Sequence, residues 1–333
     1  MSGGSIAYHL RENKAIERNL FVDLLARIGR VENISDYTYT GFGGPFLEDF
    51  KTLHSALRIA KMISIEADGN VCKRQEFNSP AQFIQLKNET SGDFLRAHEF
   101  SGRNIVWLDY TSPSDLYVQL SELRTLVGKL GCFDVAKITL NANPAALGGT
   151  PGLNLHTTRV KILADRLGDH CKQVLEEDDV LPSNYPSTLL HAIHGALGSL
   201  ATRASGEYFQ ILSAFVYKDG GHQMLTVTGI VLNAKESAVV DDFFDKSRVK
   251  HWPFHNIDWT APLEISVPSL STKERITLDS ALPAPEAVNW GDYLCDHLGY
   301  CPSETTNVQA IKDQLVNYAK FYRAYPLFSR VVL

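Results

Sequence analysis

Short apolar runs alternate along much of the chain with longer segments in which apolar residues recur every three or four positions. Such runs are typical of buried strands, and the periodic segments are typical of amphipathic helices. The pattern predicts strands near residues 37–41, 62–65, 83–86, 104–108 and 135–140, with a helix after each of the first four. Strands that alternate with helices predict a parallel sheet covered on both faces.

Residues 208–232 indicate a different local topology. Two strand-like runs, 208–217 and 222–232, flank the turn sequence Lys218-Asp219-Gly220-Gly221, which favours a β-hairpin. The charged helical stretch at about 153–185 is expected to be an insertion before the hairpin. The predicted fold is therefore a doubly wound, mostly parallel α/β sheet that ends in an antiparallel hairpin.

The regions on either side of this sheet have a different character. Residues 1–35 carry a helical apolar stripe and predict an N-terminal helical cap. Residues 36–233 would form the sheet domain. Residues 234–333 contain a cluster of prolines with Trp252 and Trp259 among them and one long helical segment, which favours a small C-terminal domain or lid.

Composition narrows the environment and the partners. The 333 residues carry 38 acidic side chains against 32 Lys and Arg, a net charge of −6, which argues against a general nucleic-acid binder without excluding a local basic patch. Five cysteines fit reduced thiols better than a disulfide scaffold. The first residues lack the apolar core of a signal peptide, and no apolar run is long enough to span a membrane. We therefore expect a cytoplasmic protein with no membrane partner.

The strongest local signal lies between residues 36 and 68. A short strand runs into Gly41, Gly43 and Gly44, a helix and a second strand follow, and the second strand ends at Glu66. Glycines let a ligand approach the backbone, and an acid after the second strand suits a ribose hydroxyl. An ordinary tight turn and a solvated strand end are the alternatives. The pattern predicts a nucleotide-binding βαβ unit.

Residues 12–233 resemble the class I S-adenosylmethionine-dependent methyltransferases, whose seven-stranded sheet ends in such a hairpin. The resemblance implies S-adenosylmethionine as the cofactor. It further implies that the segment Tyr39-Thr40-Gly41-Phe42-Gly43-Gly44 packs against the cofactor's methionine part and that Glu66 binds the ribose. Asn88 and Glu89, after the third strand, would flank the adenine. The segment from Asp109 to Pro113 would lie under the transferred methyl group.

The glycine motif departs from the family pattern. Tyr39 stands where the family usually has an acid that orients the cofactor's amino group, and the glycines run G-x-G-G. Asp109 is accordingly a candidate for two roles, as the base that takes the acceptor's proton or as a substitute for the missing acid; a loop-capping role is the structural alternative. Tyr110 would wall the substrate pocket or belong to the core.

The expected function is methyl transfer from S-adenosylmethionine to an oxygen acceptor on a small molecule or protein. The alternative is a catalytically degenerate methyltransferase-like module that binds a nucleotide-like ligand or, through residues 234–333, a partner protein. An NAD-binding oxidoreductase would share the βαβ start, but the hairpin argues against it.

No metal site is expected. His191 and His194 are three positions apart on an apolar helix, where packing is favoured over metal binding. Cys295, His297 and Cys301 resemble only a fragment of a zinc site, because the cysteine spacing is too long and no second pair exists.

Overall fold

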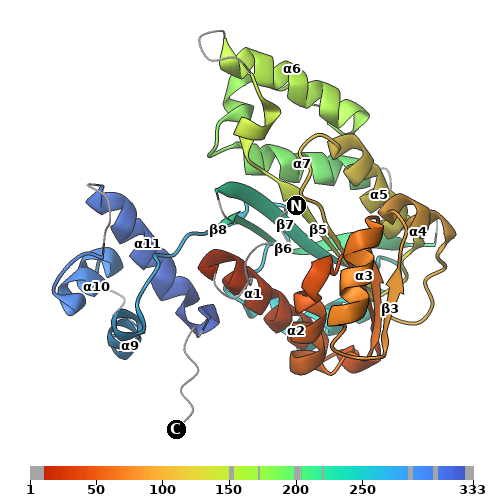
Figure 1. Cartoon of the computed structure of the whole chain (residues 1–333), viewed down its shortest axis with the longest axis horizontal. Coiled ribbons are helices and arrows are strands. Elements are labelled where there is room, and N and C mark those ends of the chain that lie inside the picture. The colour runs from red at the N-terminus through yellow and green to blue at the C-terminus, as the bar shows by residue number, and fades with distance from the viewer. Residues whose placement is uncertain are drawn as a thin grey trace. The chain divides into compact units, whose positions relative to one another are not determined.

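The computed structural model describes residues 11–149, 154–171, 173–198, 203, 205–219, 221–283, 288–302 and 307–326. Figure 1 shows the helices and strands. The strands are β1 (Thr38–Gly41), β2 (Lys61–Ile65), β3 (Ile84–Lys87), β4 (Asn104–Asp109), β5 (Val135–Asn141), β6 (Glu207–Asp219), β7 (His222–Asn233) and β8 (Leu263–Ile265). The α-helices are α1 (Glu12–Ile28), α2 (Glu48–Leu57), α3 (Gly69–Asn78), α4 (Ser91–Ala97), α5 (Leu116–Lys129), α6 (Leu155–Leu167), α7 (Tyr185–Gly198), α8 (Ser237–Ser247), α9 (Thr272–Ser280), α10 (Trp290–Leu298) and α11 (Val308–Phe321).

The strands form one sheet in the order β3-β2-β1-β4-β5-β7-β6-β8. Strands β1 to β5 pair in parallel, and β7 pairs antiparallel with β5. This confirms the predicted mostly parallel sheet that ends in an antiparallel pair. The described part of the chain adds an eighth strand, the short β8, which the sequence did not predict because three residues carry too little periodicity to detect.

The two faces of the sheet are packed by different helices. On one face, alternate residues of β4 and β5 such as Val106, Leu108 and Ile138 join the main apolar core with side chains of α4, α5 and α7. On the other face the ring of Tyr39 meets that of Phe50 from α2 edge to face, with 4.9 Å between centroids. Side chains alternate along a strand, so each strand of the sheet's centre contributes to both cores.

The helix expected directly after the glycines begins later, because Gly44–Phe46 form a 3₁₀ turn and Leu47 adopts a left-handed conformation before α2 begins. The N-cap of α4 is Thr90, whose side chain accepts a hydrogen bond from the Asp93 backbone N–H. A helix-compatible sequence leaves the exact start residue open, and tertiary packing selects it.

The chain divides into two compact units. The described parts of Val22–Val216 and His222–Leu263 form the first unit, and those of Ile6–Phe21, Tyr217–Gly221 and Glu264–Leu333 form the second. The predicted boundary at residue 234 therefore lies within the first unit. Helix α8 and the segment after it stay with the sheet, where Asn256 donates its backbone N–H to Leu212 and Trp252 donates to Asp23. No helix in the described ranges is long and apolar enough to cross a membrane.

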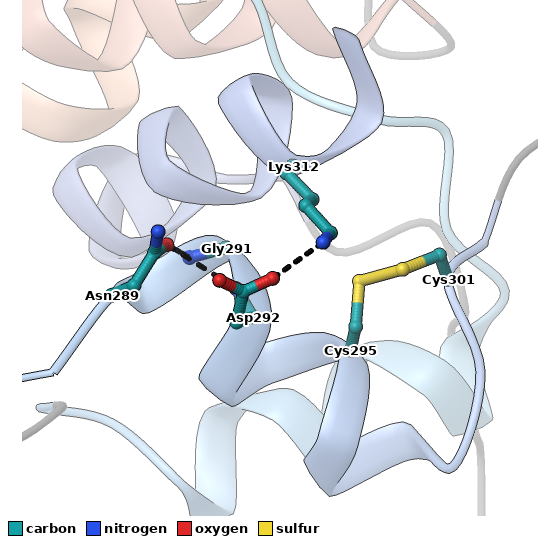
Figure 2. The surroundings of a disulfide bond; sticks show 6 residues. All are labelled: Asn289, Gly291, Asp292, Cys295, Cys301 and Lys312. Carbon is teal, nitrogen blue, oxygen red and sulfur yellow. Dashed lines mark hydrogen bonds and ion pairs between the residues drawn. A yellow bond between two sulfur atoms is a disulfide. The ribbon is translucent and has the colours of Figure 1, made fainter. Parts of the chain in front are cut away.

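The second unit holds a disulfide between Cys295 and Cys301, at the end of α10 (Figure 2). Nearby, Lys312 of α11 forms an ion pair with Asp292 of α10 at 2.5 Å, as Figure 2 shows. A Cβ at Gly291 would lie 2.8 Å from Lys312 Cβ, so α10 and α11 approach closely there. The expectation of reduced thiols is wrong for this pair, since the turn after α10 brings two cysteines six positions apart into bonding distance. The same bond excludes a zinc-site fragment.

Candidate functional site

The candidate site lies at the carboxyl edge of the sheet, where the strand order reverses. Chain connections lead from β1 to β2 and β3 on one side, while β4 and β5 lie on the other. Gly41 at the end of β1 pairs with Ser64 of β2 and with Trp107 of β4. Glu66 directly follows β2, and Asp109 is the last residue of β4. Ligands of open α/β sheets bind in the crevice at such a switch point.

The glycines of the turn after β1 are required by packing within the protein. A Cβ at Gly41 would lie 2.6 Å from the Tyr39 hydroxyl, because residues 39 and 41 share one face of the strand. A Cβ at Gly43 would lie 2.3 Å from Leu47 Cδ2 and 2.5 Å from Ser64 Oγ. Gly44 has a φ of 51°, in the left-handed region that favours glycine. The turn is thus packed closely against Tyr39, Leu47 and Ser64.

Helix α3 holds this turn in place. Gln75 Nε2 donates to the Gly44 carbonyl at 2.9 Å, and Asn78 Nδ2 donates to the Pro45 carbonyl at 2.8 Å. Ser64 Oγ donates to Gln75 Oε1 at 3.1 Å, which fixes the amide's orientation. Sequence reasoning missed both amides. Their three-residue spacing on one helix face was the available signal.

The acidic loop after β2 is internally bonded. Glu66 is half-buried, and its Oε1 accepts the Asp68 backbone N–H at 2.9 Å. Asp68 in turn caps α3 by accepting from the Asn70 N–H at 2.8 Å. Asn88 Nδ2, after β3, donates to the Glu66 carbonyl at 2.8 Å. Glu89, also half-buried, follows it at the same edge. The structure therefore brings Glu66 and Asn88 together as the sequence suggested.

Aromatic rings from the loops after β1 and β4 meet at the switch point. Phe42 packs edge to face on Tyr110, with 5.4 Å between ring centroids. The Tyr110 hydroxyl donates to Glu122 of α5, which also accepts from Ser91 Oγ of α4 at 2.7 Å. Burial, and then the Glu122 carboxylate, raise the pKa of Tyr110 above its usual range. Tyr110 therefore contributes its ring to the site, while its hydroxyl is engaged by α5.

Asp109 ends β4 beside a polar strip of the sheet. It is half-buried and pairs in register with Thr139 of β5. Trp107 Nε1 donates to Thr139 Oγ1 at 2.9 Å, and the buried Lys137 ammonium lies 3.7 Å from the centre of the Trp107 ring. Sequence reasoning missed this strip. Its signal was the polar residue at every second position of β5 within an otherwise apolar strand.

Helix α6 of the insertion forms hydrogen bonds to both the loop after β4 and the loop after β5. Arg166 of α6 donates from one guanidinium nitrogen to the Pro113 carbonyl at 2.9 Å and the Ala146 carbonyl at 3.3 Å. In α5, Gln119 Nε2 donates to the Ser112 carbonyl at 2.7 Å. The segment under the candidate acceptor position is thus held from two helices.

Comparison with known families assigns the chain. Residues 6–333 match the model of the family described as "Putative O-methyltransferase". The chain belongs to this family. Membership confirms the resemblance to the S-adenosylmethionine-dependent methyltransferases, and with it S-adenosylmethionine as the cofactor. No curated protein sequence matches the chain.

Solved structures of methyltransferases share the arrangement only distantly. The O-methyltransferase TomG from Streptomyces achromogenes is 12% identical, with 64% of this chain and 79% of TomG covered at a TM-score of 0.36. The N-methyltransferase NodS from Bradyrhizobium japonicum is 10% identical, with 65% and 96% covered at a TM-score of 0.35. At these scores neither likeness carries an argument about the acceptor.

Proposed function

We propose that the chain transfers a methyl group from S-adenosylmethionine to an oxygen acceptor on a small molecule or a protein. Family membership supports methyl transfer to oxygen. The geometric support is the convergence of the glycine turn, Glu66 and Asp109 at one edge of the sheet, on both sides of the point where the strand order reverses.

The residues at this edge fit the cofactor. Among the described residues, Glu66 Oε2 has no hydrogen-bond donor, while Oε1 is held by the Asp68 N–H. A carboxylate with one oxygen fixed and the other available suits a ribose hydroxyl. Asn88 and Glu89 lie after the neighbouring strand, where the base would be flanked. The turn at Phe42, Gly43 and Gly44 would support the methionine part.

The reaction requires the protein to position the acceptor and to accept one proton from it. S-adenosylmethionine supplies a methyl group on a sulfonium that already carries its leaving group. Transfer to an oxygen acceptor would form an oxygen–carbon bond while the carbon–sulfur bond breaks, so the acceptor would have to lose its proton. Asp109 is the group proposed to receive that proton or to hold the acceptor in line. Tyr110 and Phe42 would form an apolar wall beside it.

A second candidate is a methyltransferase-like module without turnover. The observation that favours it is Tyr39, whose buried ring occupies the position where the family has an acid. Such a module would bind a nucleotide-like ligand or a protein partner. Melting temperatures measured with S-adenosylmethionine, S-adenosylhomocysteine, NAD and ATP separate the ligand classes, since a specific ligand stabilises by mass action.

Substitution of Asp109 by Asn tests the proposal directly. The change keeps the shape and removes the charge, so methyl transfer from labelled S-adenosylmethionine to acceptors in a host extract should fall by about 10²–10⁴. Affinity for S-adenosylhomocysteine should change little. Asp115→Asn, in the exposed part of the same loop, is the matched control and should retain activity.

The outcomes distinguish the roles. A loss of affinity in Asp109→Asn would make Asp109 the substitute for the missing acid instead of the base. Cofactor binding by the wild type without transfer to any component of the extract would favour the module.

A further inference from the structure

The glycine turn is joined to α3 by an unusual buried amide. Helix α3 is polar along its length, and the residues it buries are Cys72 and Gln75. The Gln75 side chain is fully buried. A buried amide is unfavourable unless its donor and acceptor are both bonded, so packing alone would favour an apolar residue of similar volume at this position. A role in hydrogen bonding is the remaining explanation for the glutamine.

Both ends of the Gln75 amide are used toward the turn. Its nitrogen donates to the Gly44 carbonyl at 2.9 Å, and its oxygen accepts from Ser64 Oγ at 3.1 Å. The same two side chains form the surface on which Gly43 rests, since a Cβ there would lie 2.5 Å from Ser64 Oγ and 3.1 Å from Gln75 Nε2. Position and orientation of the turn are therefore set by one side chain of α3 and one of β2.

Successive carbonyls of the turn are all directed into the protein. The Gly43 carbonyl accepts from the Leu47 N–H at 2.9 Å, the Gly44 carbonyl from Gln75, and the Pro45 carbonyl from Asn78 at 2.8 Å. In a trans peptide the N–H points opposite to the C=O of the same plane. The Gly44 N–H therefore points away from Leu47, the partner of the Gly43 carbonyl. The Phe46 N–H likewise points away from Asn78, the partner of the Pro45 carbonyl. The α3 bonds hold the Gly44 and Pro45 carbonyls, so their loss would free the Gly44–Pro45 and Pro45–Phe46 peptides, whereas the Gly43–Gly44 peptide is held by the Leu47 N–H.

We propose that Gln75 is a positioning residue for the cofactor, which acts through the backbone of the glycine turn without touching the ligand. Asn78 supports the same turn one position further on. This inference rests on the proposed function, because it assumes that the turn contacts S-adenosylmethionine. The inference predicts that cofactor affinity depends on Gln75, a side chain of α3 that binds the turn's backbone and does not contact the cofactor.

Gln75→Met tests the inference, since methionine keeps the unbranched shape and removes both hydrogen bonds. The dissociation constant for S-adenosylhomocysteine, measured by calorimetry, should rise about tenfold, the equivalent of about one lost hydrogen bond. The KM for S-adenosylmethionine should rise with it, while kcat at saturating cofactor should be retained. Asn78→Ala removes one hydrogen bond at a half-buried position and should raise the dissociation constant by a smaller factor. If Gln75→Met does not fold, Asn78→Ala provides the test instead.

Gln210→Met is the matched control. Gln210 Nε2 of β6 donates to the Ile211 and Ile257 carbonyls, both at 2.9 Å, away from the glycine turn. Its loss should lower the melting temperature without changing the dissociation constant. If Gln75→Met and Asn78→Ala behave like this control, the amides are structural only and the inference is overturned. Failure of the wild-type chain to bind S-adenosylhomocysteine would instead overturn the proposed function, and the inference with it.

Discussion

At the scale of single residues, the glycines of the turn have two explanations that the sequence does not separate. Close approach of a ligand and close packing of the protein both exclude a Cβ. The structure supplies the second, through the Tyr39 hydroxyl beneath Gly41 and the Ser64 hydroxyl beneath Gly43. Gly43→Val would therefore disturb the core and the ligand contact together. Leu47 and Ser64 already occupy the space into which the valine side chain would extend, so both would have to shift.

Glu66 offers a cleaner residue-scale prediction. Replacement by Ala removes a carboxylate that would accept charge-assisted bonds from the ribose, worth about 1.5–3 kcal/mol. The dissociation constant of S-adenosylhomocysteine should rise about tenfold or more, as measured by calorimetry. Asp68→Asn is the control, because it keeps the α3 cap while changing the neighbouring acid, and its affinity should stay near that of the wild type. An unchanged affinity in Glu66→Ala would place the ribose elsewhere.

At the scale of elements, helices on both sides of the sheet converge on the switch point. Helix α3 holds the glycine turn through Gln75, and α5 holds the loop after β4 through Gln119 and Glu122. Arg166 of α6 holds the loop after β5 by a hydrogen bond to the Ala146 carbonyl. The expected insertion thus supports the candidate site through Arg166.

The link between Tyr110 and α5 predicts a separation of stability from activity. Tyr110→Phe removes the bond to Glu122 and should lower the free energy of unfolding by about 1–2 kcal/mol, measured by urea titration. Because the ring against Phe42 is kept, kcat should be retained. Tyr110→Leu, which removes the ring, should impair methyl transfer. A large loss of kcat in Tyr110→Phe at unchanged stability would assign the chemistry to the hydroxyl.

At the scale of the whole molecule, the second compact unit carries its own covalent constraint. The Cys295–Cys301 bond closes a loop over a sequence separation of six. By the loop-entropy estimate such a bond stabilises by about 2 kcal/mol. Cys301→Ser should therefore lower the melting temperature, and a reductant should lower that of the wild type by a similar amount. Cys171→Ser, at a free thiol, is the control and should have little effect. A reductant-insensitive wild type would contradict this role.

The sequence by itself determined the succession of strands and helices along the chain. The period of apolar residues follows directly from local backbone geometry, so strands β1 to β5, the helices between them and the β6–β7 pair were predictable. The glycine turn, Glu66 and Asp109 were predictable because each follows a strand whose carboxyl end lies at the same edge. Their assignment to individual ligand groups stays a prediction.

The tertiary structure decided what no local pattern encodes. The amides of Gln75 and Asn78, the polar strip of Trp107, Lys137 and Thr139, and the engaged hydroxyl of Tyr110 depend on partners from distant segments. The same holds for the continuation of the sheet unit to Leu263 and for the bonded cysteines. Hydrogen bonds and packing between segments depend on how the elements meet in space, and periodicity along one segment carries no information about that meeting.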